Sequence, residues 1–226
     1  MSTGVFTQNW EILMVALMLA AAHVVSPWMH DWRKHPDLEE AFGAGLSVAY
    51  VFLHLIPALD AENDPLGERV YFIALLGFSA FYGLEMYFHK RPKYRYHAYL
   101  VALFVYTGLQ VFALGLHLPP TAALVAIFGI TLAIDAINTD IDLCSEYGSR
   151  FLRGGRWILA AGVFAGYGLG LVRRPDEFVV DAVTAGLAGF MIFLVAKALL
   201  PISPKRQFWP FLLGLSSFAV FHIVLE

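Results

Sequence analysis

Five oxygen-bearing side chains recur at helical spacing within one stretch of an otherwise apolar chain. They stand at offsets 0, 3, 4, 7 and 11, and they are Asp135, Asn138, Thr139, Asp142 and Glu146. These offsets share one face of an α-helix, so a helix here would carry a stripe of oxygen donors. Asp140 belongs to the same stretch but points away from the stripe. Oxygen donors of this kind suit hard divalent cations.

Asp135 is the most informative member of the stripe. Residues 122–134, which precede it, contain no charged side chain. A carboxylate in a membrane-embedded segment is costly unless it faces a bundle interior, a cavity or a partner, so a functional role is the first interpretation. A second interpretation stays open for Asp142 and Glu146. The helix would then leave the membrane near Asn138, and these two acids would belong to its solvated end.

The composition indicates a membrane protein. Of 226 residues, 59% are hydrophobic and 15% are charged, whereas a soluble domain carries about 25% charged residues. Long apolar runs recur along the chain, which indicates a polytopic helical protein and excludes a barrel. The single cysteine allows neither an internal disulfide nor a cysteine-based metal site. Basic residues lie in short loops, so no nucleic-acid partner is expected.

The chain is predicted to be all-α, with one transmembrane domain over residues 1–226 and eight membrane-spanning helices. The spans are Trp10–Met29, Phe42–Leu59, Val70–Phe88, Ala98–His117, Thr121–Asp140, Trp157–Val172, Phe178–Leu200 and Phe208–Leu225. The first is expected to be a permanent span and not a signal peptide. The fourth and fifth are joined by a tight turn at Pro119-Pro120, which predicts an antiparallel pair.

Loop charge predicts the orientation. Of the 15 Lys and Arg residues, 11 fall in the odd-numbered connections and three in the even-numbered ones. Short loops rich in basic residues stay in the cytoplasm. The prediction is therefore an inner or plasma membrane protein with both termini outside the cytoplasm.

Other spans also carry polar side chains. His54, in the second span, is deep enough to need a hydrogen-bond partner, either as a packing residue or as a ligand. Glu85 lies near the cytoplasmic end of the third span, where it either reaches the headgroups or has a function. The fourth span holds neutral donors and acceptors, for which hydrogen bonding between helices is an adequate explanation. They are Tyr106, Thr107 and Gln110.

Three segments together carry a family resemblance. Gly43–Pro57 is a run of small residues that ends in His-Leu-Ile-Pro, Phe81–His89 ends the third span with a Glu and a His, and Ala185–Pro201 supplies a seventh span rich in small residues. With eight spans and polar clusters on the fourth and fifth, the pattern resembles the ZIP (ZRT/IRT-like) divalent metal transporters. The resemblance covers nearly the whole chain and implies a ZIP-like bundle.

The chain departs from that family at the ligand positions. The family's fourth helix carries His-Asn-x-x-Asp/Glu-Gly, and alignment on Ala113–Gly115 places neutral residues there: Tyr106, Thr107 and Gln110. The family's fifth-helix motif is matched in one of two ways. The first match is Asp135 with Asn138, and the second is Asn138, Thr139 and Asp142.

The resemblance implies a divalent metal ion as the transported substrate, with Zn²⁺, Mn²⁺ and Fe²⁺ as the candidates. Six residues are its candidate ligands: Asp135, Asn138, Asp142, Gln110, His54 and Glu85. Three further polar residues would support the site: Tyr106, Thr107 and Thr139. This oxygen-rich set suits Mn²⁺ or Mg²⁺ better than Zn²⁺. The family also suggests a homodimer in the lipid bilayer.

Two alternatives stay open. The first is a ZIP-fold protein that has lost transport and acts as a structural subunit or a sensor, which the neutral fourth-span residues favour. The second is an intramembrane metal-dependent hydrolase, which would need His23, His54 and Asp135 to converge. We do not expect this protein to be an enzyme. Two contacts are predicted: His54 with a polar residue of the fourth or fifth span, and Asp135 with Gln110 or Tyr106.

Overall fold

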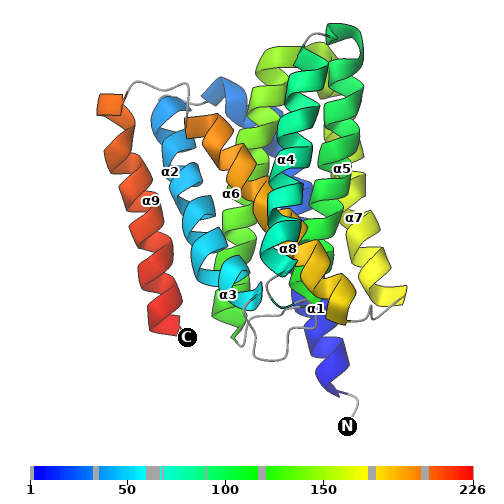
Figure 1. The fold of residues 1–226 in the computed structure, drawn as a ribbon, viewed down its shortest axis with the longest axis vertical. Coiled ribbons are helices and arrows are strands. Elements are labelled where there is room, and N and C mark those ends of the chain that lie inside the picture. The colour runs from blue at the N-terminus through cyan, green and yellow to red at the C-terminus, as the bar shows by residue number, and fades with distance from the viewer. Residues whose placement is uncertain are drawn as a thin grey trace. The chain divides into compact units, whose positions relative to one another are not determined.

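The structure is a computed structural model that describes residues 3–32, 36–59, 67, 69–89, 91–116, 121–172, 177–199 and 204–225. Every regular element in these ranges is a helix (Figure 1). In chain order the elements are α1 (Thr3–Trp32), α2 (Pro36–Tyr50), η1 (Val51–Leu55), α3 (Ile56–Leu59), α4 (Arg69–His89), α5 (Pro92–Leu116), α6 (Ala122–Tyr147), η2 (Phe151–Gly155), α7 (Arg156–Val172), α8 (Glu177–Leu199) and α9 (Pro204–Leu225). The two η elements are single π-helical turns.

The helices lie where the apolar runs predict them. Because α2, η1 and α3 are continuous, as are η2 and α7, the described residues form eight helical segments, one at each predicted span. Five of these are long and apolar enough to cross a membrane: Trp10–Met29, Arg69–His89, Tyr94–Gly115, Ala122–Tyr147 and Phe208–Leu225. The prediction of an all-helical protein compatible with a membrane is thus confirmed, whereas the span count and the orientation stay predictions. The Pro119-Pro120 turn lies outside the described residues.

The chain divides into two compact units that interleave in sequence. The first unit comprises Met1–Arg33 and Lys93–Arg174, and the second comprises Lys34–Pro92 and Pro175–Glu226. In the first unit α1 packs along α6 and α7, while in the second α2 packs on α9 and α4 on α8. Each unit has its own apolar core, with Phe128 and Leu159 fully buried in the first and Met191 and Phe218 in the second.

Small residues bring the helices of each unit close together, as their spacing predicts. A Cβ at Gly166 of α7 would collide with the backbone of Gly108 on α5, and one at Gly189 of α8 would collide with the backbone of Ala74 on α4. Without a hydrophobic driving force in lipid, such close van der Waals contact is a main source of helix association. These glycines therefore hold helices together inside each unit.

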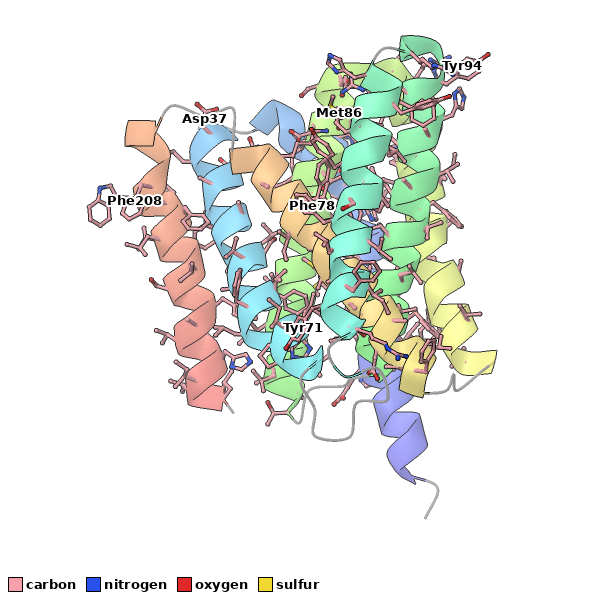
Figure 2. The ribbon with its side chains drawn as sticks, viewed as in Figure 1. Asp37, Tyr71, Phe78, Met86, Tyr94 and Phe208 are labelled. Atoms are coloured by element: carbon pink, nitrogen blue, oxygen red, sulfur yellow. The ribbon has the colours of Figure 1, made fainter. Side chains whose placement is uncertain are left out.

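The surface of α4 is apolar along its length. Figure 2 labels Tyr71, Phe78 and Met86 on this helix. Tyr71 and Met86 are 47% and 55% exposed, and Phe78 packs edge-on against Phe193 of α8, with 5.7 Å between the ring centroids. A helix with one packed side and a broad exposed apolar side is what a lipid-facing position requires.

The helix α6 extends beyond the predicted span. The Thr121 side chain accepts a hydrogen bond from the Leu124 amide at 3.3 Å and so begins the helix. Gly148, with φ of +50°, ends it and donates its amide to the Cys144 carbonyl. The 26 residues between them make a rod about 39 Å long. The helix therefore continues for two turns beyond Asp140, where the predicted span ends, and it includes the whole oxygen stripe to Glu146.

Candidate functional site

Two separate faces of α6 carry carboxylates. On one face Asp135 and Asn138 are half-buried and Asp142 is exposed. On the other face Asp140 is fully buried. Five residues separate Asp135 from Asp140, which corresponds to about 140° around the helix. The two acids therefore belong to different environments within the first unit.

Asp135 has a defined partner on α5. The Tyr106 hydroxyl donates to Asp135 Oδ2 at 3.0 Å, and Tyr106 is almost fully buried. The predicted contact between these two residues is confirmed. Because a carboxylate out of full contact with water needs a donor, a cation or a proton, the Tyr106 hydroxyl meets part of that need for the half-buried Asp135.

The two other candidate residues of α5 differ in their contacts. The Thr107 hydroxyl lies 3.2 Å from the Phe104 carbonyl and 3.4 Å from the Leu159 carbonyl on α7. It therefore joins α5 to α7. Gln110 is 5% exposed, and its Nε2 has no hydrogen-bond partner among the described residues. A buried N–H donor without a partner is costly, so Gln110 is open to an acceptor on a bound ligand, and only its amide oxygen could contact a cation.

The remaining stripe residues of α6 approach the solvated end of the helix. Thr139 is half-buried like Asn138, and Asp142 is exposed. Glu146 Oε1 lies 2.7 Å from Arg95 Nη1 on α5, and the Glu146 side chain is 42% exposed. An exposed ion pair of this kind is typical of a helix end near water. The interpretation of Glu146 as part of a solvated end is therefore favoured.

His54 and Glu85 belong to the second unit, whereas the other four candidate ligands belong to the first. The half-buried His54 lies in η1, with its ring 5.3 Å from that of Tyr50. Glu85 pairs with Lys197 of α8, with Oε2 and Nζ 2.8 Å apart. The predicted contact of His54 with the fourth or fifth span stays a prediction. Across the residues that the structure describes, no three His, Cys, Asp or Glu side chains gather to hold a metal ion.

Three buried polar residues outside the oxygen stripe of α6 join α1 to α6. They are His23, Ser26 and Asp140. His23 Nδ1 lies 3.0 Å from Asp140 Oδ2 and 3.1 Å from Oδ1. The Ser26 hydroxyl donates to the same Oδ2 at 2.8 Å. All three side chains are at most 1% exposed. Asp140 is therefore held by a histidine and a hydroxyl inside the first unit.

One atom of this group has no partner. His23 Nε2 is buried, and the described residues offer it no hydrogen bond. A buried polar atom left unsatisfied costs about 1–3 kcal/mol. A carboxylate on one ring nitrogen fixes the tautomer and leaves the other nitrogen with its lone pair. In that tautomer His23 Nε2 is a buried acceptor without a donor among the described residues.

The Arg156 guanidinium contacts the backbone of α1 one residue after His23. Arg156, at the start of α7, donates from Nη1 to the Val24 carbonyl at 3.3 Å. Its guanidinium carbon also lies 5.2 Å from the Trp157 ring centroid. Arg156 is half-buried, so its charge is only partly screened by water. His23 therefore has two charged groups nearby. The Asp140 carboxylate contacts its ring directly, and the Arg156 guanidinium contacts the backbone of the next residue.

The sequence shows Asp140 and His23 as polar residues in apolar segments, but only the tertiary structure shows that they contact each other. Asp140 lay in the stretch of interest and was set aside because it points away from the stripe. Every carboxylate in an apolar helix still needs a partner. His23, a deep polar residue of the first span, was an available one, but 117 residues separate the two.

No family model, curated protein or solved structure matches the chain. The resemblance to the ZIP family therefore rests on the sequence motifs and stays a prediction.

Proposed function

We propose that this chain is an integral membrane transporter of divalent metal cations, with a ZIP-like bundle of eight spanning helices. The observation that carries the proposal is the face of α6 on which Asp135 and Asn138 are half-buried and Asp142 is exposed. A carboxylate kept half-buried in a helix of membrane length marks an ion pathway in the first instance.

The first unit supplies the donors for the cation in this proposal. Asp135 Oδ1, the Asn138 amide oxygen and the Gln110 amide oxygen are its ligands, and Asp142 attracts the cation at the exposed end. Tyr106 holds Asp135 in place through Oδ2. Oxygen donors without a ligand histidine or cysteine favour Mn²⁺ over Zn²⁺.

The division into two units supports transport. Each unit has its own buried core and its own helix contacts. Alternating access in many transporters is a rigid-body motion of one helix bundle against another around a bound ion. We assign the ion to the first unit and the basic connections to the cytoplasmic side, with both termini outside the cytoplasm.

A second candidate is a membrane subunit or sensor of the same fold that does not transport. Two observations favour it. Asp135 already accepts a hydrogen bond from Tyr106, and the described residues contain no cluster of three acidic, histidine or cysteine ligands. A protein of this kind would retain the helices and the hydrogen bond but bind no cation.

Cation uptake by the full chain in proteoliposomes separates the two. We expect wild-type protein to take up Mn²⁺, and Asp135→Asn to reduce the initial rate by at least about tenfold, since a charged ligand is replaced by a neutral one. The matched control is Asp37→Asn, which changes an exposed acid at the start of α2 (Figure 2) and should leave uptake unchanged. Folded wild-type protein that takes up neither Mn²⁺ nor Zn²⁺ would support the second candidate.

A further inference from the structure

We propose that the turn leading into α7 is a binding site for the headgroup of an anionic phospholipid. The site consists of the exposed side chains of Arg150 and Arg153, at the start of η2, together with the exposed apolar face of α7 that follows them. It belongs to the first unit. It is separate from the Asp135 face of α6 and does not depend on cation transport.

Two guanidinium groups at this turn have no carboxylate to neutralise them. Arg150 and Arg153 are both exposed and stand three residues apart, a spacing at which the side chains of a helical turn are neighbours. Neither forms an ion pair with a carboxylate of the described residues. Glu146, the acid that precedes them, is instead paired with Arg95 of α5. The turn therefore carries a local excess of positive charge, which a phosphate group complements.

Contacts with the protein hold both arginines in place. The Tyr96 hydroxyl of α5 donates to the Arg150 carbonyl at 3.2 Å, and the Arg150 guanidinium carbon lies 5.1 Å from the Tyr96 ring centroid. Arg153 donates from Nε to the Ser149 carbonyl at 3.2 Å. That bond leaves the two terminal nitrogens of Arg153 as donors for the oxygens of a phosphate. Side chains positioned in advance lose less conformational freedom when a ligand binds.

The two glycines of η2 keep this turn compact and accessible. A Cβ at Gly155 would lie 2.9 Å from the Tyr96 hydroxyl, so a larger residue there would displace the tyrosine that supports Arg150. A Cβ at Gly154 would meet no atom within 4 Å. The backbone beside Arg153 is therefore open to a headgroup. Single π-helical turns such as η2 are frequent at functional sites.

An apolar stripe continues from the arginines along α7. Trp157 follows Arg153 by four residues, and it is 53% exposed. Spacings of one, three and four residues then place the exposed apolar side chains on one face of the helix. They are Trp157, Ile158, Ala161, Phe164, Ala165 and Leu169.

The dimensions of this stripe match one lipid molecule. A tryptophan at the start of a span typically lies at the level of the headgroups. One leaflet of the hydrocarbon core is about 15 Å thick, which corresponds to about ten residues of helix. Phe164, seven residues after Trp157, therefore lies at the depth of the acyl chains when the headgroup contacts Arg153. A free phosphate or an acidic peptide would use the guanidinium groups but not the apolar stripe, so the pattern favours a phospholipid.

The predicted orientation is consistent with this ligand. The loop between the fifth and sixth spans is one of the basic loops for which a cytoplasmic position is predicted. The cytoplasmic leaflet is the one that carries anionic lipids, and basic side chains at its surface are attracted to them.

Lipid binding to the purified protein is the direct test. Full-length protein in non-ionic detergent is titrated with phosphatidylglycerol or with phosphatidylcholine of the same acyl chains, and bound lipids are counted by native mass spectrometry. We expect wild-type protein to bind phosphatidylglycerol in preference to phosphatidylcholine. Substitution of both arginines, Arg150→Gln with Arg153→Gln, should weaken phosphatidylglycerol binding by about 25-fold, since each basic side chain contributes about fivefold. Phosphatidylcholine binding should not change.

The matched control is Arg91→Gln. Arg91 is also exposed and also lies over a tyrosine ring, with its guanidinium carbon 4.4 Å from the Tyr87 centroid, but its Nη1 donates to the Tyr87 hydroxyl at 2.7 Å. We expect this variant to bind phosphatidylglycerol as wild type does. An equal loss in Arg91→Gln would show that the lipid follows overall positive charge, and the site at η2 would be wrong.

Three further outcomes would overturn the inference. The first is a wild-type protein without preference for phosphatidylglycerol. The second is unchanged phosphatidylglycerol binding in the Arg150→Gln, Arg153→Gln variant when its far-UV circular dichroism shows that it is folded. The third is displacement of the lipid by excess inorganic phosphate, which would make the ligand a free phosphate. Because none of these measurements uses Mn²⁺, failure of the transport proposal would leave the lipid site unaffected.

Discussion

Asp135 and Asp140 stand five residues apart on α6, yet the protein holds them in different ways. Asp135 is half-buried and accepts a hydrogen bond from the Tyr106 hydroxyl of α5. Asp140 is fully buried between α1 and α6, with a histidine and a serine on its oxygens. A carboxylate that must exchange its partner needs an accessible oxygen, whereas one that holds a histidine in place needs complete enclosure. The contrast separates a half-buried acid on one face of α6 from an enclosed acid on another.

The largest expected effect is on folding stability at the enclosed acid. Asp140→Ala leaves His23 and Ser26 buried without their acceptor, and each buried polar group left unsatisfied costs about 1–3 kcal/mol. The matched change, Asp135→Ala, removes the acceptor of the Tyr106 hydroxyl at a half-buried site and should cost about 1–3 kcal/mol. Unfolding in mixed detergent measures both. Equal losses for the two variants would show that the two faces do not differ in burial as described.

The second effect concerns the donor to Asp135. Tyr106→Phe removes a hydrogen bond to a charged acceptor and should lower the free energy of unfolding by about 1.5–3 kcal/mol. A carboxylate deprived of its donor needs a cation more, so Mn²⁺ should stabilise this variant more than it stabilises wild type. The control is Tyr82→Phe, which changes an exposed tyrosine on α4. A loss of all Mn²⁺ response in Tyr106→Phe would instead make the tyrosine oxygen a ligand.

A smaller effect tests the neutral part of the cation site. Gln110→Leu removes a buried amide whose Nε2 has no partner in the described part of the chain. Replacing an unsatisfied polar group by an apolar one of similar size is neutral or stabilising, by up to about 1–2 kcal/mol. We therefore expect equal or greater stability without metal, together with weaker Mn²⁺ stabilisation. Loss of stability without metal would show that Gln110 makes a structural hydrogen bond.

The positions of the helices could be predicted because each depends on local composition. Eight apolar runs gave eight helical segments, including the continuous rod through η1 in which His54 lies. The contact between Tyr106 and Asp135 was also within reach, because the helical rise places both residues at nearly equal distances from the turn between α5 and α6. In each case the information lies in one helix or in two helices adjacent in the chain.

Contacts between distant helices could not be predicted in this way. The pairing of His23 with Asp140 depends on α1 packing against α6, and no periodicity in either helix specifies that neighbour. The same holds for the division into two units, since the first unit takes one helix from the start of the chain and the others from its middle. The sequence analysis selected acids that share one face of a helix. It therefore set aside Asp140, whose partner His23 lies on another helix.

The smallest expected effect lies at the end of α6, where the Asp135 face meets water. Glu146 and Arg95 form an ion pair at 2.7 Å, with side chains 42% and 21% exposed. Exposed pairs of this kind contribute about 0.2–1 kcal/mol and weaken as salt rises. Glu146→Gln should therefore cost no more than this in low salt, with most of the loss abolished near 1 M salt, and it should leave Mn²⁺ uptake unchanged. Asp142→Asn, one turn closer to Asp135, should instead slow uptake, because Asp142 attracts the cation without holding it. If Glu146→Gln slows uptake as much as Asp142→Asn does, the cation pathway extends to the last turn of α6. Glu146 would then belong to the cation-binding face and not to a solvated helix end.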